Sequence, residues 1–235
     1  TILISYLYNT HILRKEEFMD FDFIAKFSPM FVKAGILTLK LAFYGILLSI
    51  IIGFICTLIK YKRLPLLSPL VSAYIELSRN TPLLIQLFFL YYGLPKLGVQ
   101  ISGFTCAIVG LAFLGGSYMS ESFRLGFEAI KKSQIESAMS LGLSEAQIVF
   151  YVVLPRAFAI ALPSISANII FLLKETSIVS IVALADLVYA AKDIIGLYYK
   201  TNEALFMLSV SYLIIILPLS LALTLLEKRL AYMRG

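Results

Sequence analysis

The sequence has little charge and few residues that could build a metal or redox site. Only 14% of its 235 residues are charged, whereas 60% are apolar or aromatic. A soluble domain typically carries about 25% charged residues, so a water-facing globule is excluded, and so is a disordered chain. A single histidine, His11, and two cysteines, Cys56 and Cys106, do not make up a zinc or haem site. Both cysteines lie in apolar segments, which predicts small buried side chains rather than a disulfide.

The sequence also lacks the motifs of several catalytic and structural classes. It contains no G-x-x-x-x-G-K-[ST] phosphate-binding loop, no histidine-rich segment and no Ser/His or paired-carboxylate constellation. An enzyme is therefore not predicted, and neither is a cofactor bound by this chain. No alternation of apolar and polar residues continues for the ~10 residues that a membrane barrel strand needs. The first residues also lack the basic start, apolar run and cleavage site of a signal peptide.

What the sequence has instead is long apolar runs, with a mean hydropathy of +0.91. A helix of ~20 apolar residues crosses the ~30 Å of hydrocarbon in a bilayer. Five runs are candidates, over about 39–59 (starting as early as 31), 82–94, 101–120, 160–184 and 206–226. They predict an all-α integral membrane protein with about five transmembrane helices. The expected organisation is an extracytoplasmic or interfacial arm at 1–30 with a surface-lying helix over 2–13, a transmembrane domain at 31–230 and a tail at 231–235.

The net charge of +6 is distributed in a way that predicts orientation in a membrane. A nucleic-acid-binding protein gathers its cations among polar residues on one face, whereas here they lie mainly between apolar runs, so nucleic acid is not an expected partner. Cytoplasmic loops of membrane proteins carry an excess of Lys and Arg. In a five-span chain the most basic regions all fall on one side, namely Lys60, Lys62, Arg63 and Arg79, then Arg124, Lys131, Lys132 and Arg156, and finally Lys228, Arg229 and Arg234. An outside N-terminus and a cytoplasmic C-terminus are therefore expected.

Polar groups inside the apolar runs mark a second feature. Charges within a span are costly and usually face a partner or a cavity. Lys174 and Glu175 are adjacent and so point ~100° apart, which means that their partners lie elsewhere, whereas Glu121 and Arg124 are spaced to pair at i, i+3. Together with Ser117, Asn168 and Thr176 they form either a path for the ammonium and carboxylate of an amino acid or a network between helices or subunits. Both interpretations remain open at this point.

Residues 121–160 form the longest connection on the basic side and predict two short helices. One runs from about 134 to 141 and stops at Gly142, a residue suited to a helix C-terminus. The next starts at Ser144, with Gln147 completing a capping box, and ends before Pro155. An apolar side is expected from Ile135, Ala138, Met139, Ile148 and Val149. Such an elbow is either a docking site for a soluble partner or a hairpin lying on the lipid headgroups.

Three motifs in this chain resemble those of a known family. Glu136-Ser137-Ala138, Gly142 and the Val152-Val153-Leu154-Pro155 ending resemble the EAA loop of ABC importer permeases, with Ser137 in place of the first Ala of that motif. The segment with Arg79, Thr81, Pro82 and Gln86, ending in Tyr92-Gly93-Leu94-Pro95, is similar to polar amino acid permeases such as histidine and glutamine importers, with Asn80 in place of Gly. Lys174 to Ser177 resembles the Lys-Asp-Thr-Ser of the same group, with Glu175 in place of Asp.

The start of the second apolar run carries the Arg79-Asn80-Thr81-Pro82 part of this resemblance. Asn80 or Thr81 is expected to cap a helix whose first turn contains Pro82, a position where no N–H is needed. In the third run, Gly110, Gly115 and Gly116 predict close helix packing.

The resemblance implies a function and a set of partners. It implies a multi-pass permease subunit of an ATP-binding-cassette importer in a bacterial inner membrane, carrying a polar amino acid. ATP and Mg would be held by two ATP-binding subunits, whose grooves would receive the elbow as a coupling helix, with Glu136 at the edge of the contact. A second permease copy, identical or merely similar, and an extracytoplasmic solute-binding protein are implied as well. A stand-alone secondary carrier or channel is the alternative, and it explains the apolar runs but not the elbow motif.

Overall fold

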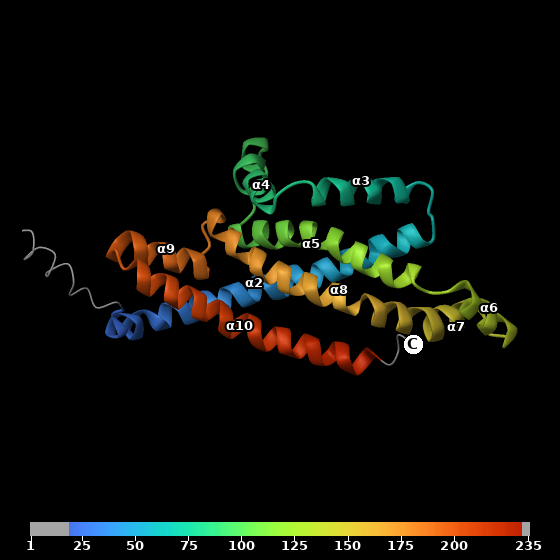
Figure 1. Cartoon of the computed structure of the whole chain (residues 1–235). Coiled ribbons are helices and arrows are strands. Elements are labelled where there is room, and N and C mark those ends of the chain that lie inside the picture. The colour runs from blue at the N-terminus through green and yellow to red at the C-terminus, as the bar shows by residue number, and fades with distance from the viewer. Residues whose placement is uncertain (1–18, 232–235) are drawn as a thin grey trace, which may run out of the picture.

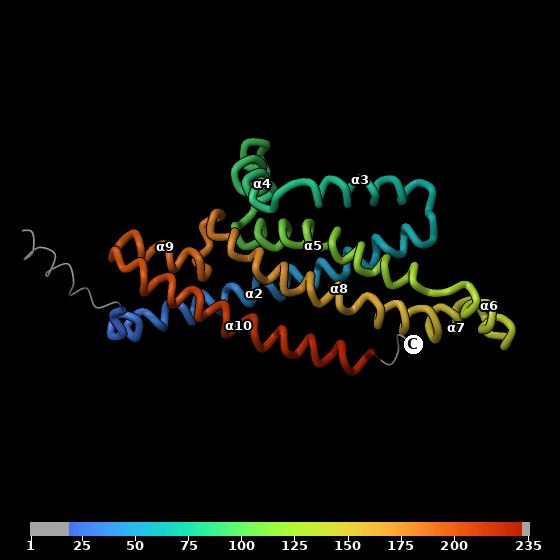
Figure 2. The backbone as a smooth tube through the Cα atoms, in the orientation of Figure 1, coloured from blue at the N-terminus to red at the C-terminus, as the bar shows by residue number. Residues whose placement is uncertain are grey.

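The computed structural model describes residues 19–231, and in this part of the chain the regular elements are all helical. The all-α prediction is therefore confirmed. The predicted surface-lying helix over 2–13, the residue His11 and the tail at 232–235 lie outside the described residues. Figures 1 and 2 show an elongated bundle whose long helices run roughly along a common axis.

The described elements are four long helices, α2, α5, α8 and α10, with shorter helical segments between them. In order they are α2 (Phe21–Tyr61), α3 (Leu67–Arg79), α4 (Leu83–Phe88), η2 (Phe89–Gly93), η3 (Leu94–Leu97), α5 (Gly103–Glu128), α6 (Lys132–Ser140), α7 (Glu145–Ile148), η4 (Val149–Val153), α8 (Leu154–Glu175), η5 (Thr176–Val182), α9 (Leu187–Tyr198) and α10 (Thr201–Leu230). Four stretches are long and apolar enough to cross a membrane, namely Phe21–Tyr61, Gly103–Glu128, Glu145–Val182 and Thr201–Leu230. The predicted second span is present as the shorter apolar stretch Leu83–Leu97.

Helix α2 starts earlier than the apolar run suggested and contains 41 residues. The Asp20 carboxylate caps its first turn by accepting the Phe23 N–H at 2.9 Å. Pro29 lies inside the helix and has no N–H for the Ala25 carbonyl four residues back. The Ser28 hydroxyl donates to that carbonyl at 2.8 Å instead. A local side chain thus supplies the hydrogen bond that proline cannot donate. Helix α2 therefore includes residues 21–30, which are predicted from the sequence as part of the N-terminal arm.

The connection between α3 and α4 differs from the predicted cap. Helix α4 follows Pro82 and has no side-chain cap. Asn80 and Thr81 both turn back toward α3, where Asn80 Nδ2 donates to the Glu76 carbonyl and Thr81 Oγ1 to the Leu77 carbonyl, each at 2.8 Å. The capping prediction for these two residues is therefore wrong. The last carbonyls of a helix have no hydrogen-bond partners within the helix. Here the carbonyls at the end of α3 bind the side chains of Asn80 and Thr81, which are then not available to cap α4.

Small residues bring α2 and α5 close together. Gly45, Ser49, Gly53 and Thr57 recur every four residues along α2, and all four are buried. A Cβ at Gly53 would lie 2.7 Å from the Ser120 backbone nitrogen. Thr57 Oγ1 donates to the Ser120 carbonyl at 2.9 Å. Such a stripe lets two backbones approach within a membrane.

The glycines of α5 also lie at close contacts, Gly115 and Gly116 with α2 and Gly110 with α4. A Cβ at Gly110 would lie 2.8 Å from a Leu87 methyl, and a Cβ at Gly116 would lie 2.6 Å from an Ile52 methyl. At Gly115 an added Cβ would collide with the Ser49 hydroxyl. The predicted close packing at these three glycines is confirmed.

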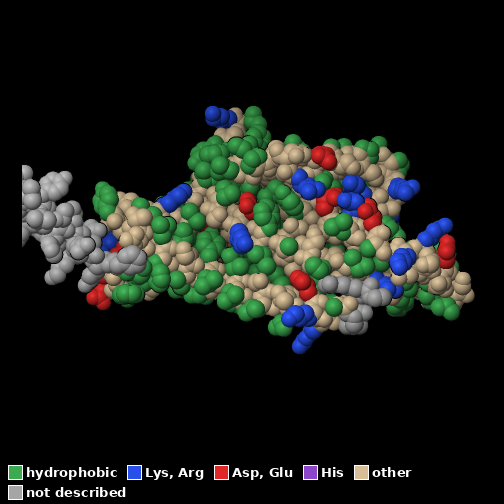
Figure 3. Space-filling model, in the orientation of Figure 1, with side chains coloured by type: hydrophobic (Ala, Val, Ile, Leu, Met, Phe, Trp, Pro, Cys, Tyr) green, Lys and Arg blue, Asp and Glu red, His purple; other side chains and the backbone are tan. Residues whose placement is uncertain are grey.

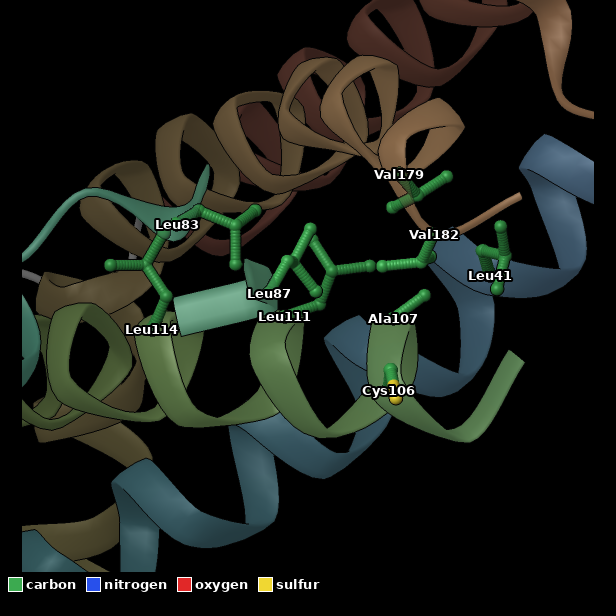
Figure 4. Close-up of a cluster of buried hydrophobic side chains, with 9 residues drawn as sticks. All are labelled: Leu41, Leu83, Leu87, Cys106, Ala107, Leu111, Leu114, Val179 and Val182. Carbon is green, nitrogen blue, oxygen red and sulfur yellow. The ribbon is translucent and has the colours of Figure 1, made fainter. Parts of the chain in front are cut away.

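A buried apolar cluster holds the short helix α4 against the long ones (Figure 4). Its members come from α2, α4, α5 and η5, and they are Leu41, Leu83, Leu87, Cys106, Ala107, Leu111, Leu114, Val179 and Val182. Cys106 is fully buried here, and Cys56 is buried in a second cluster. Both are free, as the sequence predicts. Because Leu83 is part of the cluster, the loop that precedes α4 is held in place beside α5.

The two ends of the bundle differ in what they carry. Helices α6 and α7 lie at the same end as the C-terminal end of α10, and α9 lies with the start of α2 at the other end (Figure 1). At that second end, Lys200 Nζ lies 3.1 Å from Asp20 Oδ2 and 3.4 Å from Glu203 Oε1. The Asp20 N–H donates to Glu203 Oε1 at 3.0 Å. These contacts join the starts of α2 and α10.

Candidate functional site

The elbow formed by α6 and α7 has the local structure that its sequence predicts. Gly142 adopts a φ of +78°, which L side chains rarely adopt. Its N–H donates to the Met139 carbonyl at 2.9 Å and the Leu143 N–H donates to the Ala138 carbonyl at 3.3 Å, the bonding pattern of a Schellman C-cap. Ser144 and Gln147 then form the predicted capping box that opens α7. The stop and the restart of the helix are both confirmed.

The apolar side of the elbow is turned inward, contrary to the expectation that it faces a partner. Ala138 and Ile148 are buried in a cluster with side chains from the ends of α5 and α8. Met139 and Leu141, in contrast, are 54% and 80% exposed at the tip. The expected apolar docking side is therefore wrong for Ala138 and Ile148, because the transmembrane helices cover it. The outward apolar surface at the tip consists of Met139 and Leu141, and Phe150 and Tyr151 are exposed in η4, directly after α7.

The other motif residues of the elbow lie at its edge and at its junction with α8. Glu136 is exposed and pairs with Lys132 of its own helix at 3.5 Å. The Ser137 carbonyl accepts the Leu141 N–H at 3.2 Å. Helix α7 ends at Ile148, before Pro155 as predicted, but the π-type turn η4 then joins it to α8 without a break, which the sequence did not predict. Leu154 and Pro155 form the first turn of α8 after this change of hydrogen-bond register, where the missing proline N–H is tolerated.

A cavity of about 390 Å³ lies where the end of α3, the start of α4, the middle of α5 and the end of α8 meet. Its polar lining includes Arg79 and Glu175, and its aromatic walls are Tyr118 and Phe171. The Arg79 guanidinium carbon lies 5.3 Å from the centroid of the Tyr118 ring, within the range of a cation–π contact. One cationic and one anionic side chain thus face the same cavity.

The charges beside this cavity form an alternating row along α5. Arg124 contacts Glu121 Oε2 through Nη2 at 2.6 Å and through Nε at 3.2 Å, which confirms the predicted i, i+3 pair. On its other side, Arg124 Nη1 contacts Glu128 at 2.7 and 2.9 Å. Arg79 Nη1 lies 3.9 Å from Glu121 Oε2. Figure 3 shows acidic and basic side chains gathered between α3 and the second half of α5.

Lys174 and Glu175 have different surroundings, as adjacent helical residues should. Glu175 lines the cavity, whereas Lys174 is exposed on the surface of α8. Among residues 19–231 neither side chain forms an ion pair. Of the two, only Glu175 is placed to meet a ligand in the cavity.

The predicted hydroxyl and amide residues serve contacts within and between helices. Ser117 Oγ accepts from Ser78 Oγ at 3.0 Å, Asn168 Nδ2 donates to Ser122 Oγ at 2.8 Å, and Thr176 Oγ1 donates to the Leu173 carbonyl at 2.6 Å. None of these three residues lines the cavity. Ser117 and Asn168 thus join neighbouring helices, whereas Thr176 bonds to the end of the helix that precedes it.

The family-like start of the second apolar run is assembled around one side chain. Gln86 Nε2 donates to the Thr81 carbonyl at 3.1 Å and to Thr81 Oγ1 at 3.0 Å. It thereby holds Thr81, and Pro82 beside it, in the wall of the cavity. Sequence reasoning missed Tyr118 and Phe171, because nothing in their local sequence separates them from the other aromatic residues.

Comparison with known proteins finds relatives along most of the chain. The model of a family described as "Binding-protein-dependent transport system inner membrane component" matches residues 26–232. The "Probable glutamine ABC transporter permease protein GlnP" of Bacillus subtilis (strain 168) is 38% identical over 179 residues, which are 74% of this chain and 82% of that protein. The "Arginine transport system permease protein ArtQ" of the same strain is 31% identical over 215 residues, which are 90% and 98% of the two chains.

Solved structures show the same arrangement of helices. The structure described as "Crystal structure of an amino acid ABC transporter with histidines" matches with a TM-score of 0.83 and 34% identity, over 90% of this chain and 99% of that chain. An inward-facing conformation of the MetNI methionine ABC transporter matches with a TM-score of 0.71 and 19% identity, over 87% and 98% of the two chains. At that lower identity the likeness is one of fold.

Proposed function

The chain belongs to the binding-protein-dependent transport system inner membrane components, as a permease subunit of an amino-acid ABC importer, and we propose that it forms the path for a polar amino acid. It is the membrane component of such an importer and not its ATPase. As a multi-pass protein it resides in the bacterial inner membrane. In this proposal ATP and Mg are bound by two partner subunits, which drive the transport.

The elbow is the proposed contact with the ATP-binding subunit. Its apolar inner face is already covered by the chain's own helices, so that α6 and α7 move together with α5 and α8. Its tip presents Met139 and Leu141 to the surroundings. A partner that covers these two side chains and pushes on the elbow therefore pushes on the transmembrane helices as well.

The distribution of cations supports a cytoplasmic position for the elbow. The end of the bundle with α6 and α7 also carries the ends of α2 and α10 (Figure 1), and their basic residues include Lys60, Lys62, Lys228 and Arg229. An excess of Lys and Arg is typical of the cytoplasmic side. In this orientation the start of α2 and helix α9 face outward, where a solute-binding protein would dock. A second permease copy, identical or similar, would complete the path.

The observation that carries the substrate proposal is the cavity with Arg79 and Glu175 in its lining. A guanidinium binds a carboxylate through paired hydrogen bonds, and a carboxylate accepts hydrogen bonds from an ammonium group. A polar amino acid carries both groups on one carbon. The volume of the cavity, about 390 Å³, is within the range of small-molecule sites. Tyr118 and Phe171 would then contact the remainder of the ligand.

One experiment tests the elbow and uses a matched pair of substitutions. The chain is co-expressed with its ATP-binding subunit, and copurification of that subunit is measured. Leu141→Asp places a charge at the tip and should abolish copurification. Leu197→Asp changes a leucine of similar exposure, 70% against 80%, at the opposite end of the bundle and should leave copurification intact. Equal losses for both variants would contradict the docking surface.

A second experiment tests the substrate and the energy source. The assembled importer and its binding protein are reconstituted in liposomes, and ATPase stimulation is measured with each of the twenty amino acids. A polar amino acid should stimulate hydrolysis, and Arg79→Gln should raise its half-saturating concentration. Uptake by the purified chain alone, driven by an ion gradient and independent of ATP, would instead identify a secondary carrier.

A further inference from the structure

Arg79 stands between two places where it can meet a carboxylate. On one side is the cavity, which its side chain lines. On the other side is Glu121, which does not line the cavity and whose Oε2 lies 3.9 Å from Arg79 Nη1. That distance is well beyond the ~3.2 Å limit of an N–H···O hydrogen bond. The Arg79 guanidinium therefore has a carboxylate close by without being hydrogen-bonded to it.

The carboxylate of Glu121 is held by Arg124 instead. Two contacts, of 2.6 and 3.2 Å, join the Arg124 fork to Glu121 Oε2, the same oxygen that is nearest to Arg79. Arg124 is held in turn by two contacts with Glu128. All three residues lie on one face of α5, at i, i+3 and i+7, so the helix itself sets their order.

Glu121 would not stay unpaired without this arrangement. Its side chain is only 22% exposed, and a half-buried carboxylate without a partner is unfavourable. If Arg124 lost its charge, the cations left beside Glu121 would be Lys60, at the end of α2, and Arg79, on the edge of the cavity and 3.9 Å from Glu121 Oε2. Glu121 would then occupy the guanidinium that a ligand carboxylate needs.

We propose that Arg124 is a positioning residue for substrate binding, which holds the Glu121 carboxylate back and so leaves Arg79 free for the carboxylate of an amino acid. This inference rests on the proposed function, because it requires an amino acid in the cavity. It assigns Glu121 the role of a competitor within the protein. Arg124 itself does not touch the ligand.

The test measures amino-acid-stimulated ATPase activity of the complete importer in liposomes, as half-saturating concentration and maximal rate. Arg124→Gln should raise the half-saturating concentration by about fivefold, the effect of a competing ion pair of about 1 kcal/mol, with a smaller change in the maximal rate. Arg124→Lys keeps the charge but not the two-pronged guanidinium, so its half-saturating concentration should lie between those of the wild type and Arg124→Gln. Glu128→Gln removes the other partner of Arg124 and is the matched control, expected to stay within about twofold of the wild type.

The double variant separates positioning from a purely structural role. Glu121→Gln removes the competitor, so Glu121→Gln/Arg124→Gln should return to the wild-type half-saturating concentration, and Glu121→Gln alone should match it as well. A wild-type response in Arg124→Gln, or a double variant as weak as Arg124→Gln, overturns the proposal. Weakened binding in Glu121→Gln alone also overturns it, because Glu121 would then contact the ligand. If no amino acid stimulates the wild type, the proposed function fails and this inference fails with it.

Discussion

Lys200 and Asp20 lie 180 positions apart in the chain, yet the Lys200 ammonium contacts the Asp20 carboxylate at 3.1 Å. This pair joins the start of α10 to the start of α2, at the end of the bundle opposite the elbow (Figure 1). The Phe23 N–H and, after it, the Lys200 ammonium hold the pKa of Asp20 below its usual value. The ion pair between Asp20 and Lys200 therefore exists only while Asp20 is ionised, whereas the bond from the Asp20 N–H to Glu203 does not depend on this charge.

The lowered pKa of Asp20 predicts how this junction responds to acid. A carboxyl whose pKa is lower in the folded state contributes stability above its unfolded pKa and loses it as the pH falls through the folded value. The protection of amides at the starts of α2 and α10, taken relative to their intrinsic exchange rate at each pH, should thus fall below about pH 4. Asp20→Asn should show this lower protection already at neutral pH, with little further change on acidification. Asp22→Asn, which removes a neighbouring charge, is the control, and equal behaviour of the two variants would contradict the prediction.

A second prediction concerns Asp186, which is fully buried at the start of α9 and lies outside the four long spans. Burial raises its pKa to about 6, although the N–H groups of Tyr189 and Val188 favour the ionised form. A carboxyl with a raised pKa contributes stability below its unfolded pKa and loses it as the pH rises through the folded value. The wild type should therefore lose on the order of 2 kcal/mol of stability between about pH 4 and pH 7.

Two substitutions at this position separate charge from capping. Asp186→Asn keeps a side-chain oxygen for the helix cap and removes the charge, so its thermal unfolding in detergent should depend less on pH. Asp186→Ala also removes the charge but loses the cap, at a cost of about 1 kcal/mol. If Asp186→Asn followed the pH dependence of the wild type, the titrating group would be a different one.

The third prediction concerns the contact between α2 and α5 at Gly53. A Cβ there would lie 2.7 Å from the Ser120 nitrogen, so Gly53→Ala forces the two helices apart. Such overpacking costs about 1–3 kcal/mol and should lower the unfolding temperature of the purified protein. Gly35→Ala is the matched control on the same helix, because its nearest neighbours are side-chain atoms at 3.8 and 3.9 Å. A similar loss at both positions would contradict the close approach.

The fourth prediction concerns the backbone at Gly142. The space around it is open, but its φ is +78°, and a β-branched residue there is strained by about 1–2 kcal/mol. Gly142→Val should weaken coupling between ATP hydrolysis and transport, measured as amino acid moved per ATP, by shifting the elbow. Gly142→Asn tolerates this backbone and should behave almost as the wild type. Gly196→Val is the control for added bulk, since Gly196 also faces open space and its φ is not positive.

The sequence by itself determined the features that depend on near neighbours. Apolar length predicted the membrane helices, Gly142 and the Ser144–Gln147 box predicted the stop and restart within the elbow, and spacing on one helix predicted the Glu121–Arg124 pair. Each of these is a property of one continuous segment, or depends on hydrogen bonds and contacts between residues within about two helical turns of each other. Such interactions form in the same way wherever the helix is placed.

Only the tertiary structure decided which surfaces are covered and which side chains meet. Arg79, Tyr118 and Glu175 come from three helices, and no local pattern brings them to one cavity. Asn80 turned back to a carbonyl of the preceding helix instead of capping the next one. In the elbow, Ala138 is buried and Leu141 exposed because the ends of α5 and α8 cover one side. These arrangements are stabilised by contacts between segments that are distant in the chain, and residue spacing does not predict such contacts.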